Sequence, residues 1–538
     1  MKDSYYLKLI RTNWKAGITV GLVSIPLAVS LAVATQTTPL VGIITAIWAG
    51  LIAAIFGGSD YNIIGPTGAL AGVLIVYTSK YGNGCLPMIA ILTGILIFIA
   101  YIFKFEKYLI FVPGSALHGF ILGVSIIVML TQVEAIFGLP PLPKHETLLG
   151  NVYESFCNIK LMHLPSFILF CCMYACLMIF SFFIPRIPGA IVITPVGILI
   201  GYLCSRGFLP WALPTLGTKY HELHSSLFQF PSLKFNLAYL LPSVSVAAIS
   251  ILETMISARI ADGVTKTKHN RRKEMLGLSL ANLASGFAGG LPATAALART
   301  SLNIRSGGTH KIAAGISSIF IALASLCFLS SFQYLPLAVI AAILVYIATG
   351  MLETEHFWYM YRIDKKNIAI SLIVAFFTVY EDAIVGILLG AVIAMLLMMQ
   401  RLSTGYHEII IKGREEELPA DQKQSTTRDN TLIYAIKGQL AYINAQSHLA
   451  HLENISADYA NVILKLRDVY FIDLDGVEAF SEIVQALSDK GKNVFIVSPN
   501  PVIEHLLNES TQFKELQKNN RVYPELNQAI QGINQLQQ

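Results

Sequence analysis

The stretch Ser285–Gly308, SGFAGGLPATAALARTSLNIRSGG, lies inside a long apolar region but lacks the pattern of an ordinary membrane helix. Three glycines in its first six residues interrupt regular structure, and Pro292 suits the first turn of a new helix. A helix over 293–305 would be about 20 Å long, too short for a hydrocarbon core of roughly 30 Å. A helix that starts in mid-membrane points unpaired N–H groups and the positive end of its dipole at whatever lies in front of it. With the cation Arg299 one turn further on, the stretch predicts a pocket for an anion.

The composition indicates two different bodies. Of 538 residues, 54% are hydrophobic and 13% are charged, which is typical of a polytopic membrane protein. Residues 1–399 carry 25 Lys or Arg and 15 Asp or Glu, whereas residues 400–538 carry 13 and 18. We therefore expect a basic transmembrane domain over 1–400 and an acidic soluble domain over 401–538, with a polar insertion at about 415–428.

Apolar runs predict about fourteen membrane segments. The loops on the side that includes the N-terminus carry eighteen Lys and Arg residues, and the loops on the other side carry six. We therefore expect a protein of the cell (inner) membrane with both termini in the cytoplasm. The predicted segments are 16–34, 40–57, 66–78, 86–103, 113–136, 165–184, 187–204, 237–260, 274–289, 292–305, 311–330, 333–350, 366–380 and 382–400.

The first half of the chain contains a counterpart of the opening stretch. The pair Gly57-Gly58 precedes Gly65–Gly72, GPTGALAG, which predicts another short helix that begins at Pro66 and ends near Thr78. Seven segments separate the two copies, so the second must be inverted in the membrane. One broken segment in each half of an inverted repeat points to a transport site near the bilayer midplane.

The eighth segment carries a polar stripe. Ser250, Glu253, Thr254 and Ser257 are spaced i, i+3, i+4 and i+7, which places them on one helix face. A carboxylate inside a membrane helix indicates function, although Glu253 could also be tied to a hydroxyl or backbone group. Arg299 could attract a substrate, or it could neutralise Glu253 in the low dielectric.

After residue 400 the pattern changes to that of a soluble α/β domain. Predicted strands are 407–412, 431–436, 462–466 and 494–497, and predicted helices are 441–454, 477–490, 502–508, 512–519 and 524–535.

These sequences resemble the SulP anion-transporter family over nearly the whole chain. The segments Gly17–Ala34, FGGSDYNIIGPTGALAG at 56–72 and Ile251–Gly308 are similar to its characteristic regions. The tail, ILKLRDVYFIDLDGVEAFSEIVQAL at 463–487 with NVFIVS at 493–498, resembles a STAS domain. The resemblance implies a 7+7 inverted repeat with a core and a gate domain, a dimer, and an elevator-like shift of a substrate held between two half-helix N-termini.

Matching motif positions assign roles to individual residues. The resemblance implies that backbone N–H groups of both half-helices bind the anion and that Arg299 lies near it. It also implies that Glu253 couples transport to H⁺ or Na⁺. The implied sets are Thr67, Gly68 and Ala69; Thr294, Ala295 and Ala296; and, around the coupling ion, Glu253, Thr254 and Ser257.

Two positions depart from the family pattern. Pro26 is followed by Leu27 where many relatives carry Gln or Glu, so one polar ligand or proton site is missing. In regulatory STAS proteins a Ser or Thr lies two residues after the loop aspartate; here Asp473 is followed two positions later by Asp475. Phosphorylation at that position is excluded, and Asp475 can act as a fixed negative charge at a helix N-terminus.

We therefore expect a secondary active transporter for a small anion of the sulfate, bicarbonate or dicarboxylate class, and no enzyme. No HExxH, P-loop or nucleophile-elbow pattern occurs, and we expect no cofactor, no nucleic-acid partner, and no metal other than a Na⁺ near Glu253. The alternatives that stay open are an uncoupled exchanger or channel on the same fold, a nucleobase symporter, and a membrane-anchored scaffold or sensor whose STAS domain binds a cytoplasmic protein.

Overall fold

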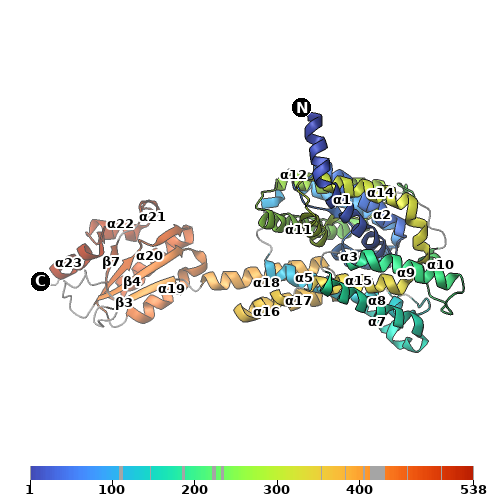
Figure 1. The fold of residues 1–538 in the computed structure, drawn as a ribbon. Helices are drawn as coiled ribbons and strands as arrows, with labels where there is room; N and C mark the ends of the chain where they lie inside the picture. The colour runs from blue at the N-terminus through green and yellow to red at the C-terminus, as the bar shows by residue number, and fades with distance from the viewer. Residues whose placement is uncertain are drawn as a thin grey trace. The chain divides into compact units, whose positions relative to one another are not determined.

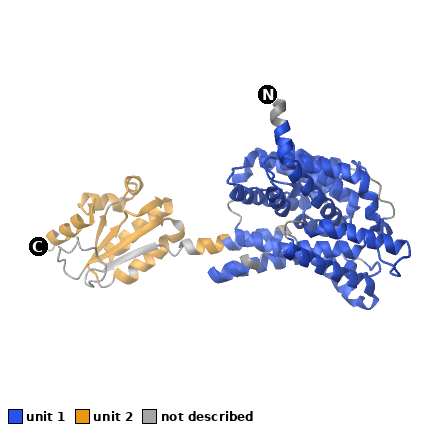
Figure 2. Ribbon diagram, in the orientation of Figure 1, with its two compact units in different colours: residues 1–394 blue, residues 395–538 orange. Residues whose placement is uncertain are grey.

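The structure is a computed structural model with two compact units, Met1–Ala394 and Met395–Gln538 (Figure 2). We describe each unit by itself. The expected insertion at 415–428 lies outside the described residues. The structure describes residues 2–107, 113–143, 145, 147–184, 188–220, 226–231, 235–352, 354–381, 383–403, 406–411, 431–456, 459–497 and 500–536.

The first unit is built of helices, and seven helical stretches of its described residues are long and apolar enough to cross a membrane. The chain is therefore a polytopic α-helical membrane protein, as the sequence predicts. The seven stretches contain α1 (Lys2–Ala34), α2 (Pro39–Phe56), α4 (Leu86–Ile102), α5 (Gly114–Thr131) with α6 (Val133–Phe137), α8 (Leu164–Phe183), α11 (Leu240–Thr265) and α14 (Ile312–Phe328). Shorter or more polar helices fill the other predicted segments: α9 (Gly189–Ser205), α12 (Arg271–Phe287), α15 (Leu337–Met351), α17 (Lys365–Tyr380) and α18 (Ala383–Ser403).

Helices from the two halves of the chain pack in pairs. Helix α12 lies against α2 and α4, and α14 lies against α1 and α2, whereas α17 lies against α5 and α15 against α8 (Figure 1). Close approach requires small residues: a Cβ added at Gly42 on α2 would lie 2.1 Å from the carbonyl oxygen of Ala28 on α1. Two groups of helices result, one from α1–α4 with α11–α14 and the other from α5–α9 with α15–α18.

The two broken segments adopt a strand followed by a short helix. The first contains β1 (Ile64–Gly65) and α3 (Gly68–Tyr81), and the second contains β2 (Thr294–Ala295) and α13 (Leu297–Arg305). The prediction that the second helix covers 293–305 is wrong at its start. Thr294 and Ala295 pair with the other broken segment instead, and this long-range pairing leaves no local signal in the sequence.

Three short helices of the first unit fall between the predicted segments. They are α7 (Leu148–Cys157), α10 (Leu216–Tyr220) and α16 (Thr354–Ile363). Their lengths are below what a membrane span needs, which explains why a search for long apolar runs does not find them.

The second unit is an α/β domain with a mixed sheet. The strand order is β3-β4-β5-β7-β8, with β6 also paired to β4; β3 is antiparallel to β4, and the other pairs are parallel. Its strands are β3 (Tyr406–Ile411), β4 (Thr431–Leu440), β5 (Asn461–Lys465), β6 (Val469–Ile472), β7 (Asn493–Val497) and β8 (Val522–Tyr523). Its helices are α19 (Tyr442–Ile455), α20 (Leu474–Asp489), α21 (Pro501–Leu507), α22 (Thr511–Lys518) and α23 (Leu526–Leu536).

Alternate residues of the central strands bury opposite faces of this sheet. Tyr434 belongs to a cluster with Phe480 of α20 and Phe513 of α22, whereas its neighbour Ile433 belongs to a cluster with Ile530 of α23. This two-residue period is that of a strand covered on both sides. Strands β6 and β8, which the sequence prediction missed, are four and two residues long.

Candidate functional site

The two broken segments meet at a short two-stranded crossing. Strands β1 and β2 pair in antiparallel register, with Ile64 opposite Ala295 and Gly65 opposite Thr294. Helix α3 then begins at Gly68, and α13 begins just after the other strand. Both helices therefore start beside the same crossing, and the positive ends of their dipoles act on the same region.

The first half-helix begins at Gly68, two residues after the predicted start at Pro66, with Thr67 at its N-cap. The hydroxyl of Thr67 accepts a hydrogen bond from the N–H of Leu70 at 3.3 Å and donates one to Oε2 of Glu253 at 3.2 Å. Within the described chain, the N–H groups of Gly68 and Ala69 have no hydrogen-bond acceptor. Two donors at the start of α3 thus remain for a ligand.

The second half-helix offers different donors from those predicted. The N–H of Ala295 donates to the hydroxyl of Thr254 at 3.2 Å, and the N–H of Ala296 donates to the carbonyl of Ile63 at 3.2 Å. In this structure the protein itself thus accepts from both N–H groups, and Thr294 lies in the strand ladder. The next two residues, Leu297 and Ala298, form the first turn of α13. Their N–H groups have no hydrogen-bond acceptor among the described residues.

The polar stripe on α11 divides between two tasks. Thr254 contacts the hydroxyl of Thr294 at 2.9 Å, and Ser257 donates to Oδ1 of Asn62 at 3.0 Å. Both side chains are buried and hold the broken segments. Glu253, the third member of the predicted ion-coupling set, is half-buried. Its carboxylate contacts Thr67 at the start of α3.

Arg299 connects the second half-helix to the first. Its side chain is buried, and Nη2 donates to the carbonyl of Pro66 at 2.7 Å. Gly65 leaves room for the guanidinium, because a Cβ at that position would lie 2.8 Å from Nη1. Among the described residues, Arg299 and Glu253 form no ion pair within 4.0 Å. Within the part of the chain that the structure describes, the cation therefore lies at the crossing without a contacting carboxylate.

Side chains of α12 and α2 replace the helical hydrogen bonds that the second broken segment lacks. Asn282 binds both backbone groups of Ala293, since Nδ2 donates to the carbonyl and Oδ1 accepts from the N–H, each at 2.9 Å. Leu291 is bound in the same way by two hydroxyls: its N–H donates to Thr45 at 2.7 Å, and its carbonyl accepts from Ser285 at 2.6 Å. The break is thus a built structure with paired backbone groups.

A buried carboxylate that sequence reasoning missed holds the first broken segment. Glu274 in the first turn of α12 accepts from the N–H groups of Gly58 and Ser59 at 2.7 and 2.8 Å. Its other oxygen accepts from Nδ2 of Asn62 at 2.6 Å, and this Asn also donates to the carbonyl of Thr254 at 3.2 Å. The available signal was an acid directly after the basic run at 271–273.

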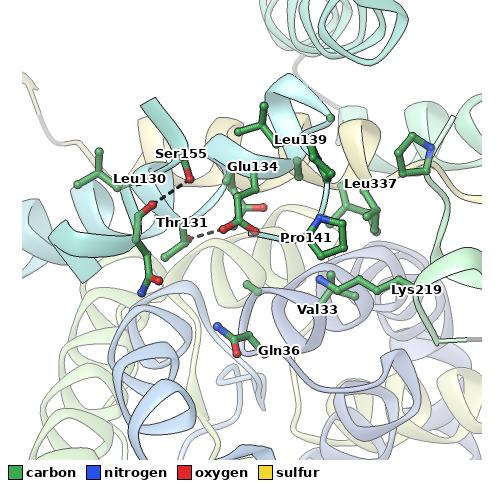
Figure 3. Close-up of a pocket in the computed structure, with 18 of the residues that line it drawn as sticks. Val33, Gln36, Leu130, Thr131, Glu134, Leu139, Pro141, Ser155, Lys219 and Leu337 are labelled. Atoms are coloured by element: carbon green, nitrogen blue, oxygen red, sulfur yellow. Dashed lines mark hydrogen bonds between the residues drawn. The ribbon is translucent and has the colours of Figure 1, made fainter. Parts of the chain in front are cut away.

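A separate cavity of about 820 Å³ opens beside the C-terminal ends of α1 and α3. Figure 3 shows Glu134, Lys219 and Gln36 around it, among largely apolar neighbours such as Leu139 and Leu337. None of the predicted anion-binding residues lines this cavity.

In the second unit, the two predicted loop aspartates flank the start of α20. Asp473 is the N-cap, and its Oδ1 accepts from the N–H of Gly476 at 2.7 Å. Asp475 is exposed in the first helical turn, where a negative charge interacts favourably with the helix dipole. Both carboxylates thus stabilise this helix N-terminus.

Two half-helices that start at one crossing inside a polytopic helical unit define a class of membrane transporter with a central binding site. The chain belongs to the sulfate permease family, whose model matches residues 10–374, and a STAS domain model matches residues 422–529. The resemblance noted from the sequence is confirmed.

Individual relatives and solved structures agree with this family. The chain is 28% identical to YvdB of Bacillus subtilis over 96% of both chains, and 23% identical to the bicarbonate transporter BicA of Synechocystis over 96% of this chain and 92% of that one. The fold is similar to that of the murine Solute Carrier 26 family member A9 anion transporter, with a TM-score of 0.81 at 16% identity over 97% of this chain and 91% of that one.

The Glu274 contacts predict a loss of stability when the carboxylate becomes an amide. Glu274→Gln replaces one acceptor oxygen with an NH2 group, which faces either the two backbone N–H donors or Nδ2 of Asn62. We expect at least one strong hydrogen bond to be lost, at about 1.5–3 kcal/mol. Melting of the detergent-solubilised protein, followed by size-exclusion chromatography after heating, measures the change. The matched control is Asp60→Asn in the same loop, where the side chain is 52% exposed. Equal melting of the two variants would contradict the role given to Glu274.

Proposed function

We propose that the chain transports a small oxyanion across the cell membrane by secondary active transport. The observation that carries this proposal is the set of N–H donors at the two half-helix starts beside the buried cation of Arg299. Oriented backbone donors and a positive charge in a low dielectric attract a compact anion. The donors come from Gly68, Ala69, Leu297 and Ala298.

The substrate class follows from the chemistry of the site and from the names of relatives. Backbone donors on two sides suit an anion with acceptor oxygens on more than one face. One relative is named BicA, a bicarbonate transporter, and another is named sulfate transporter 4.1 of Arabidopsis thaliana, which is 23% identical over 92% of this chain and 76% of that one. Sulfate, bicarbonate and dicarboxylates therefore form the proposed substrate class.

We assign coupling to Glu253, with H⁺ favoured over Na⁺. Its carboxylate contacts the Thr67 hydroxyl that caps α3, so a change in its charge acts directly on one half-helix start. Binding of H⁺ or Na⁺ neutralises this carboxylate, which lowers the electrostatic cost of placing an anion beside it. Uptake of the anion then depends on the gradient of the coupling ion.

The movement that we propose is an elevator-like shift of the first helix group, α1–α4 with α11–α14, against the second. The anion site lies entirely within the first group, because β1, β2, α3, α11 and α13 all belong to it. The cavity of Figure 3 is lined by both groups, which supports their boundary as the access route. Cytoplasmic termini and a homodimer complete the proposal.

Counterflow in proteoliposomes tests the proposed function. The purified full-length protein is preloaded with unlabelled sulfate, bicarbonate, succinate or chloride, and uptake of each labelled anion is measured with and without Na⁺ and a pH gradient. We expect counterflow with at least one oxyanion and acceleration by one of the two gradients. Currents that exceed carrier turnover would instead indicate a channel. Absence of all transport together with a stable cytoplasmic partner would indicate a scaffold.

Replacing the proposed coupling residue should abolish gradient-driven accumulation of the anion without abolishing anion binding. In Glu253→Gln we expect gradient-driven accumulation to fall to background, because the side chain no longer changes charge, while anion binding and the folded oligomer persist. Accumulation under ΔpH and ΔNa⁺ is compared with isothermal binding of the same anion. Glu381→Gln, at the exposed acid that follows α17, is the control. Full gradient-driven uptake by Glu253→Gln would remove the coupling role.

A pair of substitutions distinguishes attraction of the anion by Arg299 from a structural role of its bond to Pro66. If its charge attracts the anion, Arg299→Gln should raise the KM for uptake roughly tenfold, which corresponds to about 1.4 kcal/mol, and Arg299→Lys should raise it less. If the bond to Pro66 is what matters, both variants should be equally impaired and should melt at lower temperature. Concentration-dependent uptake and melting curves of both variants give the answer.

A further inference from the structure

Helix α16 occupies a position that the transport function does not explain. It has 10 residues, a length of about 15 Å, and cannot span a bilayer. The chain reaches it from the apolar helix α15 and leaves it through α17, so its location is fixed at the membrane surface, at the edge of the first unit (Figure 1). The positive-inside rule places this surface on the cytoplasmic side.

One face of α16 presents large aromatic side chains outward. Trp358 is 64% exposed and Tyr361 is 52% exposed, whereas Met360 is buried at 8%. The rings of Trp358 and Tyr361 meet edge to face with centroids 5.9 Å apart, and Nζ of Lys365 lies 5.6 Å from the Tyr361 ring centroid. The three side chains form a continuous stripe, which we call the aromatic–basic stripe. Tyr359 and Ile363 widen its apolar part, at 62% and 65% exposure.

Among the described side chains, the charge at the C-terminal end of this stripe is positive. Arg362, Lys365 and Lys366 are exposed, and the acid between them, Asp364, is turned toward α17, where Oδ1 accepts from the N–H of Lys366 at 3.0 Å. Trp and Tyr rings are enriched at the headgroup level of membranes, and each basic side chain there attracts anionic lipid. The pattern therefore matches the chemistry of an anionic headgroup layer.

We propose that the aromatic–basic stripe binds anionic phospholipids of the cytoplasmic leaflet. The rings of Trp358 and Tyr361 lie at the headgroup level, and the ammonium and guanidinium groups contact lipid phosphates. The covalent links to α15 and α17 hold the stripe at the bilayer surface, which selects lipid over a soluble protein as its occupant. The proposal is independent of which anion is transported.

Fluorescence quenching of Trp358 tests this proposal in the full-length protein. The other tryptophans, Trp14, Trp48 and Trp211, are replaced by Phe, and retention of the size-exclusion profile checks that this background folds. The protein is reconstituted in equimolar phosphatidylcholine and phosphatidylglycerol, with bromine on the acyl chains of one lipid or of the other. We expect brominated phosphatidylglycerol to quench roughly twofold more than brominated phosphatidylcholine, and high salt to reduce the difference.

Charge removal at the stripe provides the matched comparison. Lys365→Gln/Lys366→Gln should bring the quenching ratio to one, whereas Lys104→Gln/Lys107→Gln, at another exposed pair of lysines, should leave it unchanged. Equal quenching by both lipids in the parent protein would overturn the preference for anionic lipid. Quenching by neither lipid would overturn the lipid contact itself and indicate that protein covers the stripe. Equal loss in both lysine variants would show a nonspecific charge effect and also overturn the proposal.

Discussion

The structure depends on the requirement that backbone polar groups inside a bilayer find partners within the protein, because lipid offers none. A helix meets this requirement by itself, whereas a broken helix does not. In this chain, side chains from neighbouring elements bind the interrupted backbone. Each break is therefore stabilised by residues that lie elsewhere in the sequence. The side chains that serve the two breaks include Thr45, Glu274, Asn282, Ser285, Thr300 and Asn303.

Because most of the interrupted backbone is paired, the backbone N–H donors that stay unpaired in the described chain indicate a ligand site. An unsatisfied N–H group in a low dielectric costs free energy, so folding would select against it unless something else binds there. The donors at Gly68, Ala69, Leu297 and Ala298 lie at two helix starts that the β1–β2 pairing holds together. An anion at this point would complete the hydrogen bonding of the site, which links the stability of the crossing to occupancy by substrate.

The sequence located most elements but could not determine how the two breaks contact each other. Apolar length and the positions of Gly and Pro are local signals. They placed α3 to within three residues and located nearly all of the spans. The start of α13 depends instead on pairing between residues 64 and 295, more than two hundred positions apart. The same limit explains Glu274: its position near basic residues suggests a surface acid, and only its three donors reveal a buried anchor. The structure thus brings the two predicted segments together, and two of the predicted donors, the N–H groups of Ala295 and Ala296, bind protein acceptors.

Selectivity among anions must then come from groups other than the backbone. N–H donors bind any compact anion, and Arg299 already donates to the Pro66 carbonyl, which leaves it fewer directions in which to distinguish one oxyanion from another. The family resemblance adds Leu27 on α1, an apolar residue where many relatives carry Gln or Glu, and the side chain is half-buried here. Loss of a polar ligand removes one means of rejecting an anion by its hydrogen-bonding pattern. Discrimination in this chain should therefore depend more on anion size and charge. In the proposed coupling, the charge state of Glu253 then sets when an anion is held.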